Sequence, residues 1–275
     1  MTEQPVPFSH LIPHVIQEAS GVIAVWKPAG LATQAPPGIP SAESWLRQKL
    51  YGESSRGYLG VPHRLDRGVS GVLLFAATPR AARQLSRQFE RRQIRKTYLA
   101  LVACNAAGHD TLESLVRAAA EASGHGDSLA TGAVTWHDTI EKIPDEARAR
   151  VVAAGDSGGR EAVTLVRLRR QLPPDRLLLE LSPVTGRMHQ LRLQAAARGL
   201  PVVGDDLYGC ADADWSAATK PGTGNDQTGS DQTGDDPRTR PIALHASHIT
   251  YADPDTGAEV TVEATVPAYW PESAR

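Results

Sequence analysis

Short strand-like segments outnumber helical ones in this sequence, and the two kinds do not alternate strictly along the chain. The clearest is residues 72–77, a continuous apolar run bounded by Gly71 and Pro79, which predicts a strand buried on both faces. A doubly wound sheet needs strict alternation of strands and helices, so the pattern favours the α+β class. Further strands are predicted at residues 21–26, 96–103, 132–136, 161–168 and 176–181, with two more between 242 and 270 that are joined by a turn at 253–257.

Helices are predicted at three places. Residues 41–50 have a helical pattern, and a second helix should begin after Thr78, which can cap it, with Pro79 at the first helical position. A third helix is predicted at 188–198, where a glycine and a proline then end the pattern. Residues 105–131 are polar and rich in Gly and Ala, and they are assigned neither strand nor helix.

No linker divides the chain, so residues 1–275 are expected to form one domain, with an acidic insertion at 211–240. Residues 211–236 of the insertion carry six Asp and one Lys, and Asp-Gln-Thr-Gly occurs there twice, beginning at Asp226 and Asp231. Large apolar residues are almost absent there, so the segment cannot bury a core and is predicted to be disordered.

Composition indicates a globular protein of the cytoplasm. The chain is 41% hydrophobic and 22% charged, and no run approaches the ~18 apolar residues that span a bilayer. The N-terminus lacks the basic start and apolar run of a secretory signal. Since no apolar run long enough to span a bilayer exists, no membrane association is expected. Cys104 and Cys210 are the only cysteines, without a CxxC motif, so we also expect no disulfide framework and no zinc site.

The net charge of −2 hides a strongly basic region. Residues 61–100 contain nine Arg or Lys against one Asp and one Glu, which suggests a surface for a polyanion such as RNA. Arg80, Arg83, Arg87 and Arg91 recur at helical spacing and would form one row suited to phosphate contacts. An ordinary solvated helix face is the alternative interpretation.

Polar groups capable of chemistry gather first at residues 63–71, directly before the buried strand. Asp66 has Arg64 and Arg67 close in sequence, which should keep its carboxylate ionised and able to act as a nucleophile or base. A structural Arg–Asp pair beside a turn would give the same pattern.

A second group, at residues 185–192, straddles the start of the third predicted helix. A helix N-terminus with Arg187, His189, Gln190 and Arg192 is suited to binding an anion. His189 has no second metal ligand at suitable spacing, and the Gly-rich residues 199–209 lack the GxxxxGK pattern of a phosphate-binding loop. The sequence therefore points to no metal and no nucleotide cofactor.

Three segments, in this order, resemble the RluA-type pseudouridine synthases. They are HRLDRGVSGVLLFA from residue 63, KTYLALV from residue 96, and LSPVTGRMHQLRLQAAARGLPVVGDDLYG from residue 181. The flanking VWKPAGLA and ALHASHITYADPDTG are also similar to that family. The resemblance implies the pseudouridine synthase fold: a mostly antiparallel mixed sheet in two lobes, with flanking helices and a central cleft.

The resemblance also implies an activity, the isomerisation of specific uridines in structured rRNA or tRNA to pseudouridine, with the target base flipped out of its stack. Asp66 corresponds to the catalytic aspartate, Tyr98 to a tyrosine that packs on the base and serves in proton transfer, and Arg187 to the basic residue that pairs with the carboxylate. RNA is the expected partner, DNA is not, and a monomer without cofactor is expected. The residues expected to bind the substrate are His63, Arg64, His189, Gln190 and Arg192.

Two departures from the family pattern leave a second function open. Val69 stands where the family usually has Thr, and Gln194 where it usually has His, so an RNA-binding protein could keep the fold without the reaction. The presence of Asp66, Tyr98 and Arg187 argues against this, because a binding protein has no need for an acidic residue in a groove meant for phosphates. A hydrolase of the N-glycosidic bond is a third class, but neither motif offers it a second carboxylate.

Overall fold

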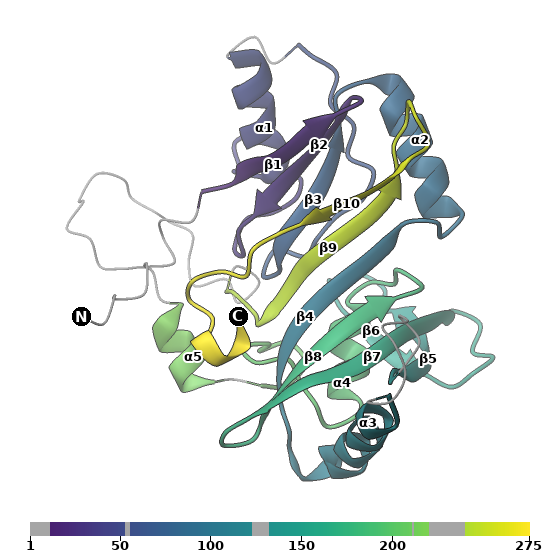
Figure 1. Cartoon of the computed structure of the whole chain (residues 1–275), viewed down its shortest axis with the longest axis vertical. Coiled ribbons are helices and arrows are strands. Elements are labelled where there is room, and N and C mark those ends of the chain that lie inside the picture. The colour runs from purple at the N-terminus through teal and green to yellow at the C-terminus, as the bar shows by residue number, and fades with distance from the viewer. Residues whose placement is uncertain (1–11, 53–55, 123–131, 211, 220–239) are drawn as a thin grey trace.

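A computed structural model describes residues 12–52, 56–122, 132–210, 212–219 and 240–275 of the chain. In these ranges ten strands form one continuous mixed sheet (Figure 1), in the order β1-β2-β3-β9-β4-β8-β7-β5-β6, with β10 also paired to β9. Among the described strands, only β3 and β9 pair in parallel. The strands are β1 (His14–Ala19), β2 (Val22–Lys27), β3 (Ser70–Ala76), β4 (Arg95–Ala103), β5 (Val134–Lys142), β6 (Ala149–Val152), β7 (Arg160–Leu172), β8 (Arg176–Pro183), β9 (Leu244–Ala252) and β10 (Glu259–Glu263).

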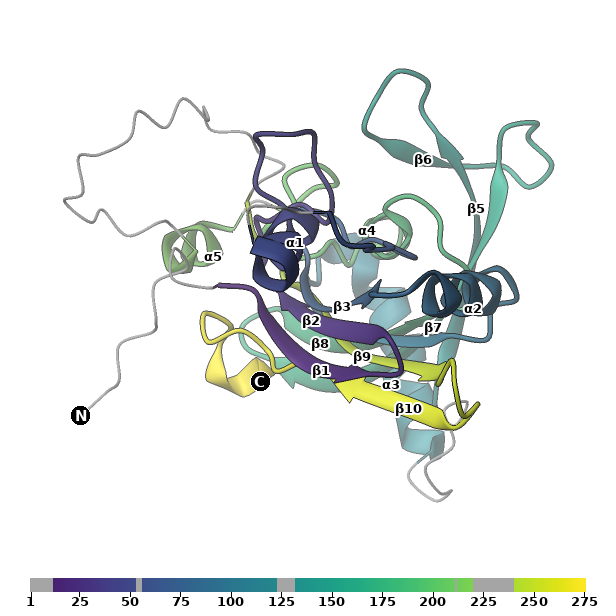
Figure 2. The same cartoon turned by 90° about the horizontal axis from the view of Figure 1, so that it is seen from above.

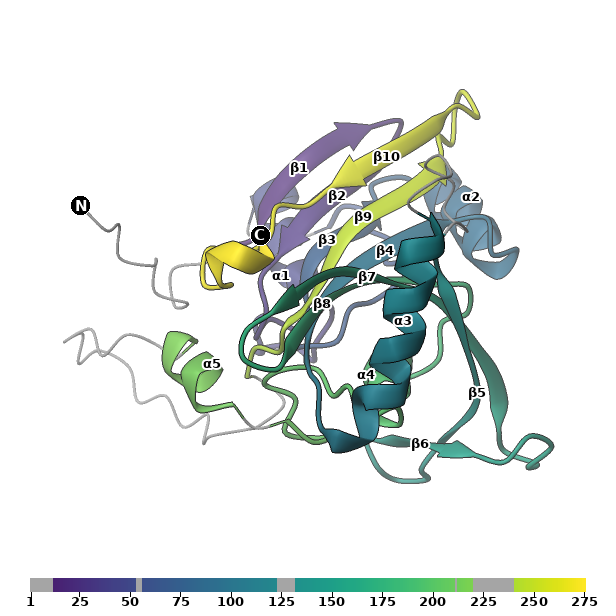
Figure 3. The same cartoon turned by 60° about the horizontal axis from the view of Figure 1, so that its bottom comes forward.

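Helices cover both faces of this sheet. Figure 2 shows α1, α2 and α4 on one face, and in Figure 3 α3 crosses the other face in front of β7. No helix in the described ranges is long and apolar enough to cross a membrane. The helices are α1 (Ala42–Tyr51), α2 (Pro79–Glu90), α3 (His109–Ala122), α4 (Gln190–Ala196) and α5 (Ala213–Ala218), with short 3-10 turns at Ala106–Gly108 and Glu272–Ala274.

Local sequence explains where the first two helices begin. The Ser41 side chain accepts a hydrogen bond from the backbone N–H of Ser44 at the start of α1. Thr78 caps α2 in the same way, and Pro79 occupies its first turn, where the missing N–H costs nothing. Leu85 is buried on the inner side of α2, while its arginines lie on the exposed side. Both predicted helices are confirmed.

One hydrophobic core runs through the whole sheet. It includes residues of β2 and β3 on one side of β9 and residues of β4, β8 and β7 on the other side, and these two sides are the two halves of the molecule. The strand β3 is buried over its whole length, as its unbroken apolar run predicted. The β5–β6 hairpin (residues 134–152) stands out from the body in Figure 2, and a smaller hydrophobic cluster lies under it. The cluster is formed by Ile140, Ala149, Ala162 and Leu193, with Met188 and Tyr208 packed against it. The α+β prediction, with a mostly antiparallel mixed sheet, is confirmed.

Several elements were not predicted. The strands β1 and β6 were missed, and the segment 105–131, assigned no element, contains α3. Within the predicted disordered insertion, 211–240, the structure has helix α5, whose Trp215 is buried and donates a hydrogen bond to the Pro241 carbonyl. Residues 211 and 220–239 lie outside the described residues.

A buried histidine joins β3 to β9 at their parallel pairing. The ring of His245 contacts the Ser70 hydroxyl through Nδ1 (2.9 Å) and the Ala264 carbonyl through Nε2 (3.0 Å). Since a carbonyl only accepts, Nε2 carries the hydrogen and Nδ1 accepts from Ser70. Burial lowers the pKa of His245 to about 4.

We therefore expect this histidine to weaken the fold in acid. Between pH 6.5 and about 4 the unfolded chain binds a proton at His245 that the folded chain does not, so stability falls as the pH falls through this window. For this one group, the free energy of unfolding should be about 2 kcal/mol lower at pH 5 than at pH 7. Urea unfolding at both pH values, with wild type and His245→Gln, measures the difference; an equal loss in both proteins would contradict it. His137→Gln, at an exposed site, is the control and should behave as wild type.

Candidate active site

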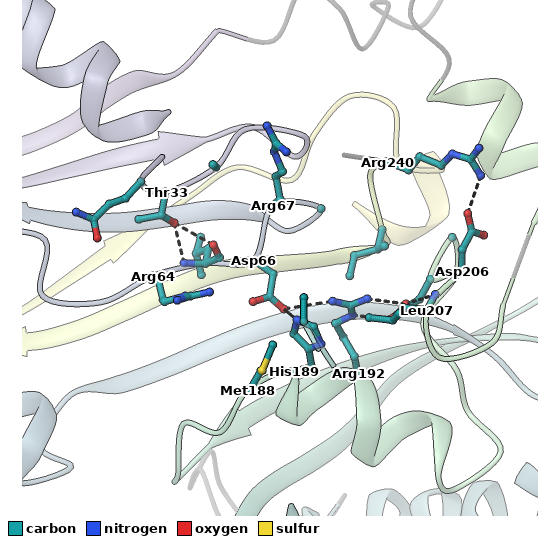
Figure 4. A pocket seen from close by; sticks show the side chains of 18 residues that line it. Thr33, Arg64, Asp66, Arg67, Met188, His189, Arg192, Asp206, Leu207 and Arg240 are labelled. Carbon is teal, nitrogen blue, oxygen red and sulfur yellow. Dashed lines mark hydrogen bonds and ion pairs between the residues drawn. The ribbon is translucent and has the colours of Figure 1, made fainter. Parts of the chain in front are cut away.

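Two adjoining cavities of about 540 and 750 Å³ form a cleft between the halves of the molecule. Their shared wall comes from the loop before β3 and from the start of α4 (Figure 4). The residues that line both cavities are Arg64, Leu65, Asp66, Ala147, Met188, His189 and Arg192.

The loop that carries Asp66 (residues 63–69) is held by hydrogen bonds from several sides. The Thr33 hydroxyl donates to the Leu65 carbonyl (2.9 Å) and accepts from the Leu65 N–H (3.0 Å). The backbone N–H of Ile242 donates to the Gly68 carbonyl, and a Cβ on Gly68 would lie 2.7 Å from the carbonyl oxygen of Arg240. The loop is thus rigid, as a scaffold for a reactive side chain needs to be.

Lys27 is part of this support, although nothing in the sequence indicated a role for it. Its side chain is fully buried, and Nζ donates to the carbonyls of Pro28 (2.8 Å), Leu31 (2.7 Å) and Arg67 (3.4 Å). Burial lowers the pKa of Lys27 to about 7, although the Asp66 carboxylate acts in the opposite direction. The ammonium therefore ties the turn after β2 to the loop of Asp66.

The Asp66 carboxylate faces two groups of the opposite half. Nη1 of Arg192 donates to its Oδ2 (3.4 Å), and Nε2 of His189 lies 3.8 Å from the same oxygen. The Asp66 side chain is 27% exposed, so a ligand in the cleft can reach it.

Arg192 is itself held by a buried carboxylate. Asp205, 1% exposed, accepts from Nε (2.6 Å) and Nη2 (2.7 Å) of Arg192, and it also accepts from the backbone N–H groups of Leu207 and Tyr208. This bidentate pair fixes the plane of the guanidinium and leaves Nη1 directed at Asp66. In the sequence the loop 199–209 stood out only for its glycines, and nothing in it indicated the role of Asp205.

The predicted pairing of Arg187 with Asp66 is wrong. Nε of Arg187 donates to the Glu161 carbonyl (2.8 Å), and the arginine that reaches the carboxylate is Arg192, which was predicted only to bind substrate. The physical reason is the backbone at His189, which has a left-handed conformation (φ 52°) directly before α4. The chain changes direction there, so the loop that carries Arg187 does not continue the buried helix that carries Arg192. Arg187 still lines the larger cavity.

Two other predicted substrate-binding residues have roles inside the protein. Nε2 of His63 accepts from the Leu74 N–H (2.9 Å), and its ring stacks on Phe89 of α2, so it lines neither cavity. Gln190 borders the larger cavity, but its amide donates to Thr164 (2.9 Å) and accepts from the hydroxyl of Thr185 (2.7 Å). Arg64 and His189 line both cavities, so they remain candidates for contact with a ligand.

Tyr98 lies in the larger cavity with a lysine that sequence reasoning missed. Burial and the charge of Asp66 raise the pKa of Tyr98, so its hydroxyl stays protonated. Lys96, two residues earlier on β4, lines the same cavity, and burial lowers its pKa. Among the described residues no ion pair to Lys96 is found, which leaves its ammonium available to an anionic ligand. Residues two apart on a strand lie on the same face, so the spacing of Lys96 and Tyr98 was the signal in the sequence that could have identified Lys96.

The two departures from the family pattern also have places in the structure. Val69 is buried and borders the larger cavity. Gln194 is fully buried, accepting from Thr164 (2.6 Å) and donating to Asp138 (2.8 Å), so it fastens α4 to the sheet. In the part of the chain that the structure describes, no group of three or more His, Cys, Asp or Glu could hold a metal ion.

Comparison with known proteins gives related sequences. The profile of the RNA pseudouridylate synthase family matches residues 21–197. Ribosomal large subunit pseudouridine synthase C of Rickettsia bellii is 31% identical over 258 residues, which cover 94% of this chain and 69% of the relative. Dual-specificity RNA pseudouridine synthase RluA of Haemophilus influenzae is 30% identical over 253 residues, 91% of each chain. The tRNA pseudouridine synthase C of Pasteurella multocida is 28% identical over 257 residues, 90% of this chain and 89% of the relative.

Solved structures show the same fold. Human RNA Pseudouridylate Synthase Domain Containing 1 gives a TM-score of 0.62 at 22% identity, covering 99% of this chain and 89% of that one. The domain-containing 4 protein also gives 0.62, at 18% identity, with 94% and 89% covered. The predicted fold is thereby confirmed.

Adjacent aspartates allow a test of the buried pair. Asp205→Asn should lower the free energy of unfolding by about 3 kcal/mol, because it removes the closer, bidentate charged partner of the Arg192 guanidinium in a largely buried place. Asp206→Asn is the matched control. Its pair with Arg240 is 30% and 45% exposed, so the loss should be below about 1 kcal/mol. Chemical denaturation measures both, and equal losses would contradict the assigned role of Asp205.

Proposed function

The chain belongs to the RNA pseudouridylate synthase family and is an RNA pseudouridine synthase, and we propose that it modifies uridines of ribosomal or transfer RNA through Asp66. The observation that carries the role of Asp66 is its carboxylate in the cleft, facing Arg192 and sharing a cavity with Tyr98. Relatives named for ribosomal RNA, transfer RNA and both support these substrate classes. The cytoplasm is the proposed place of action.

The isomerisation of uridine to pseudouridine requires only a few correctly positioned side chains. The bond from C1′ to N1 breaks and a bond from C1′ to C5 forms; the hydrogen at C5 leaves as a proton, and N1 gains one. Reactant and product are isomers, so no external group is consumed. A carboxylate can act on the sugar or the base during this exchange, and a protonated phenol can assist proton transfer. Asp66 and Tyr98 are suited to these two parts.

Arg192 takes the role first assigned to Arg187. Its guanidinium stays charged at all working pH values and, held by Asp205, meets the carboxylate of Asp66 in a set orientation. The carboxylate is thereby aimed into the cleft before substrate arrives, which lowers the cost of reaching the reactive geometry.

The larger cavity is the proposed place for the flipped uracil. It has a volume of about 750 Å³ and is lined by both Tyr98 and Asp66. Flipping a base costs a few kcal/mol, which phosphate contacts elsewhere must offset. Arg64, which is exposed at the cleft, can supply one of these contacts.

The exposed side of α2 is the proposed continuation of the RNA surface. Arg83, Arg87 and Arg91 are exposed on and just after this helix, which lies on the same face of the sheet as α4 (Figure 2). Arg80 differs from them, because it pairs with Asp255 (3.4 Å).

Tritium release tests the catalytic assignment. With RNA labelled at C5 of uridine, wild type should release label to water, whereas Asp66→Asn, which keeps the size but loses the charge, should release none above background. Asp110→Asn, on the exposed side of α3, controls for the loss of one carboxylate and should release label as wild type does. Release by Asp66→Asn near the wild-type rate would refute the role of Asp66. An inactive wild type that still binds RNA would indicate a binding protein.

Salt dependence tests the surface of α2. Changing both Arg83 and Arg87 to Gln should weaken binding to all RNAs alike and reduce the slope of log Kd against log salt by about 1.5, since each phosphate contact contributes about 0.7–0.9. Arg117→Gln, exposed on α3 at the opposite face, should leave the slope unchanged. An unchanged slope in the α2 variant would mean that its arginines only face solvent.

A further inference from the structure

His189 connects the proposed catalytic carboxylate to a tyrosine for which no role has been given. Its Nε2 lies 3.8 Å from Oδ2 of Asp66, and its Nδ1 lies 2.8 Å from the hydroxyl of Tyr208. The same hydroxyl accepts a hydrogen bond from the backbone N–H of Ala149 (3.1 Å) in the β5–β6 hairpin. The three contacts form one chain from the hairpin to Asp66.

The chemistry of these groups sets the direction of each hydrogen. The Ala149 N–H can only donate, so the Tyr208 oxygen accepts there, and its single hydrogen is free to be donated to Nδ1 of His189. An accepting Nδ1 in a neutral imidazole places the ring hydrogen on Nε2, the nitrogen that faces Asp66.

Other charged groups around His189 are consistent with a neutral ring. Burial lowers the pKa of His189; Asp66 and Asp205 act against this, and Arg192 and Arg64 add to it. Burial also raises the pKa of Tyr208, so its hydroxyl keeps the hydrogen that it donates.

We propose that Tyr208 is a positioning residue, which holds His189 in the tautomer that presents Nε2–H to Oδ2 of Asp66. Nη1 of Arg192 faces the same oxygen. Among the described residues no hydrogen bond or ion pair reaches Oδ1, so this is the carboxylate oxygen left for the substrate, as the view in Figure 4 makes visible. The effect of this tautomer on catalysis rests on the proposed function, whereas the tautomer itself does not.

The backbone at His189 makes a sharp test available. With φ at 52°, position 189 favours Asn over Gln, because Asn tolerates the left-handed region better. The amide nitrogen of Gln reaches near the place of Nε2, whereas that of Asn reaches only near Nδ1. A purely structural role thus predicts that His189→Asn is the better enzyme, and the proposed N–H donor predicts that His189→Gln is.

Turnover of labelled RNA measures this contrast. We expect kcat of His189→Gln to exceed that of His189→Asn by about tenfold or more, with KM nearly equal, since the N–H acts on the reacting carboxylate rather than on RNA binding. Equal kcat values, or a faster Asn variant, would overturn the proposal.

A spectroscopic measurement tests the tautomer without relying on activity. Long-range proton–nitrogen NMR spectra distinguish the two neutral tautomers of histidine, and the signals missing from His189→Asn identify those of His189. Wild type should show hydrogen on Nε2, and Tyr208→Phe, which keeps the ring over Arg192 but loses the hydroxyl, should show a mixture. Tyr58→Phe removes a hydroxyl from an exposed tyrosine outside the cleft and should match wild type.

The results separate the two proposals. Hydrogen on Nδ1 in wild type, or a tautomer unchanged by Tyr208→Phe, would overturn the role of Tyr208 even in an active enzyme. An inactive wild type with the expected NMR signals would instead refute the proposed function and leave the role of Tyr208 in setting the His189 tautomer in place.

Discussion

The cleft depends above all on the ion pair between Arg192 and Asp205. Burying two charges costs several kcal/mol of desolvation, and the pair offsets this only because both nitrogens of the guanidinium fork and two backbone N–H groups meet the carboxylate. Its value is therefore in geometry more than in stability. It joins α4 to the loop 204–209 and leaves one nitrogen of Arg192 for Asp66.

The same geometry explains why the cleft lies at the junction of two halves. Asp66 comes from the loop before β3, whereas Arg192 and His189 come from the start of α4 beyond β8. The sheet connects these halves through β9, which pairs with β3 on one side and β4 on the other. The loop before β3 and the start of α4 are both held by this sheet. The distance between the Asp66 carboxylate and the Arg192 guanidinium is therefore set by the packed core and not by the side chains alone.

Elements with strong local signals were predictable, and elements that depend on neighbours were not. β3 and α2 carry unbroken apolar patterns and a capping threonine, which act within a few residues. β6 has only four residues and exists by pairing with β5. α3 is stabilised by packing Leu115 against the sheet, in a segment whose Gly and Ala content concealed its helical pattern.

At the site, the sequence by itself determined that Asp66 would lie in a loop directly before a buried strand and that Tyr98 would lie on a strand, because both are local properties of their motifs. Only the tertiary structure decided which arginine meets the carboxylate. Arg187 and Arg192 are five residues apart and chemically identical, but the left-handed turn at His189 separates their directions, and Asp205 holds only the second. That choice rests on contacts across 126 residues of chain, which no motif spacing can encode.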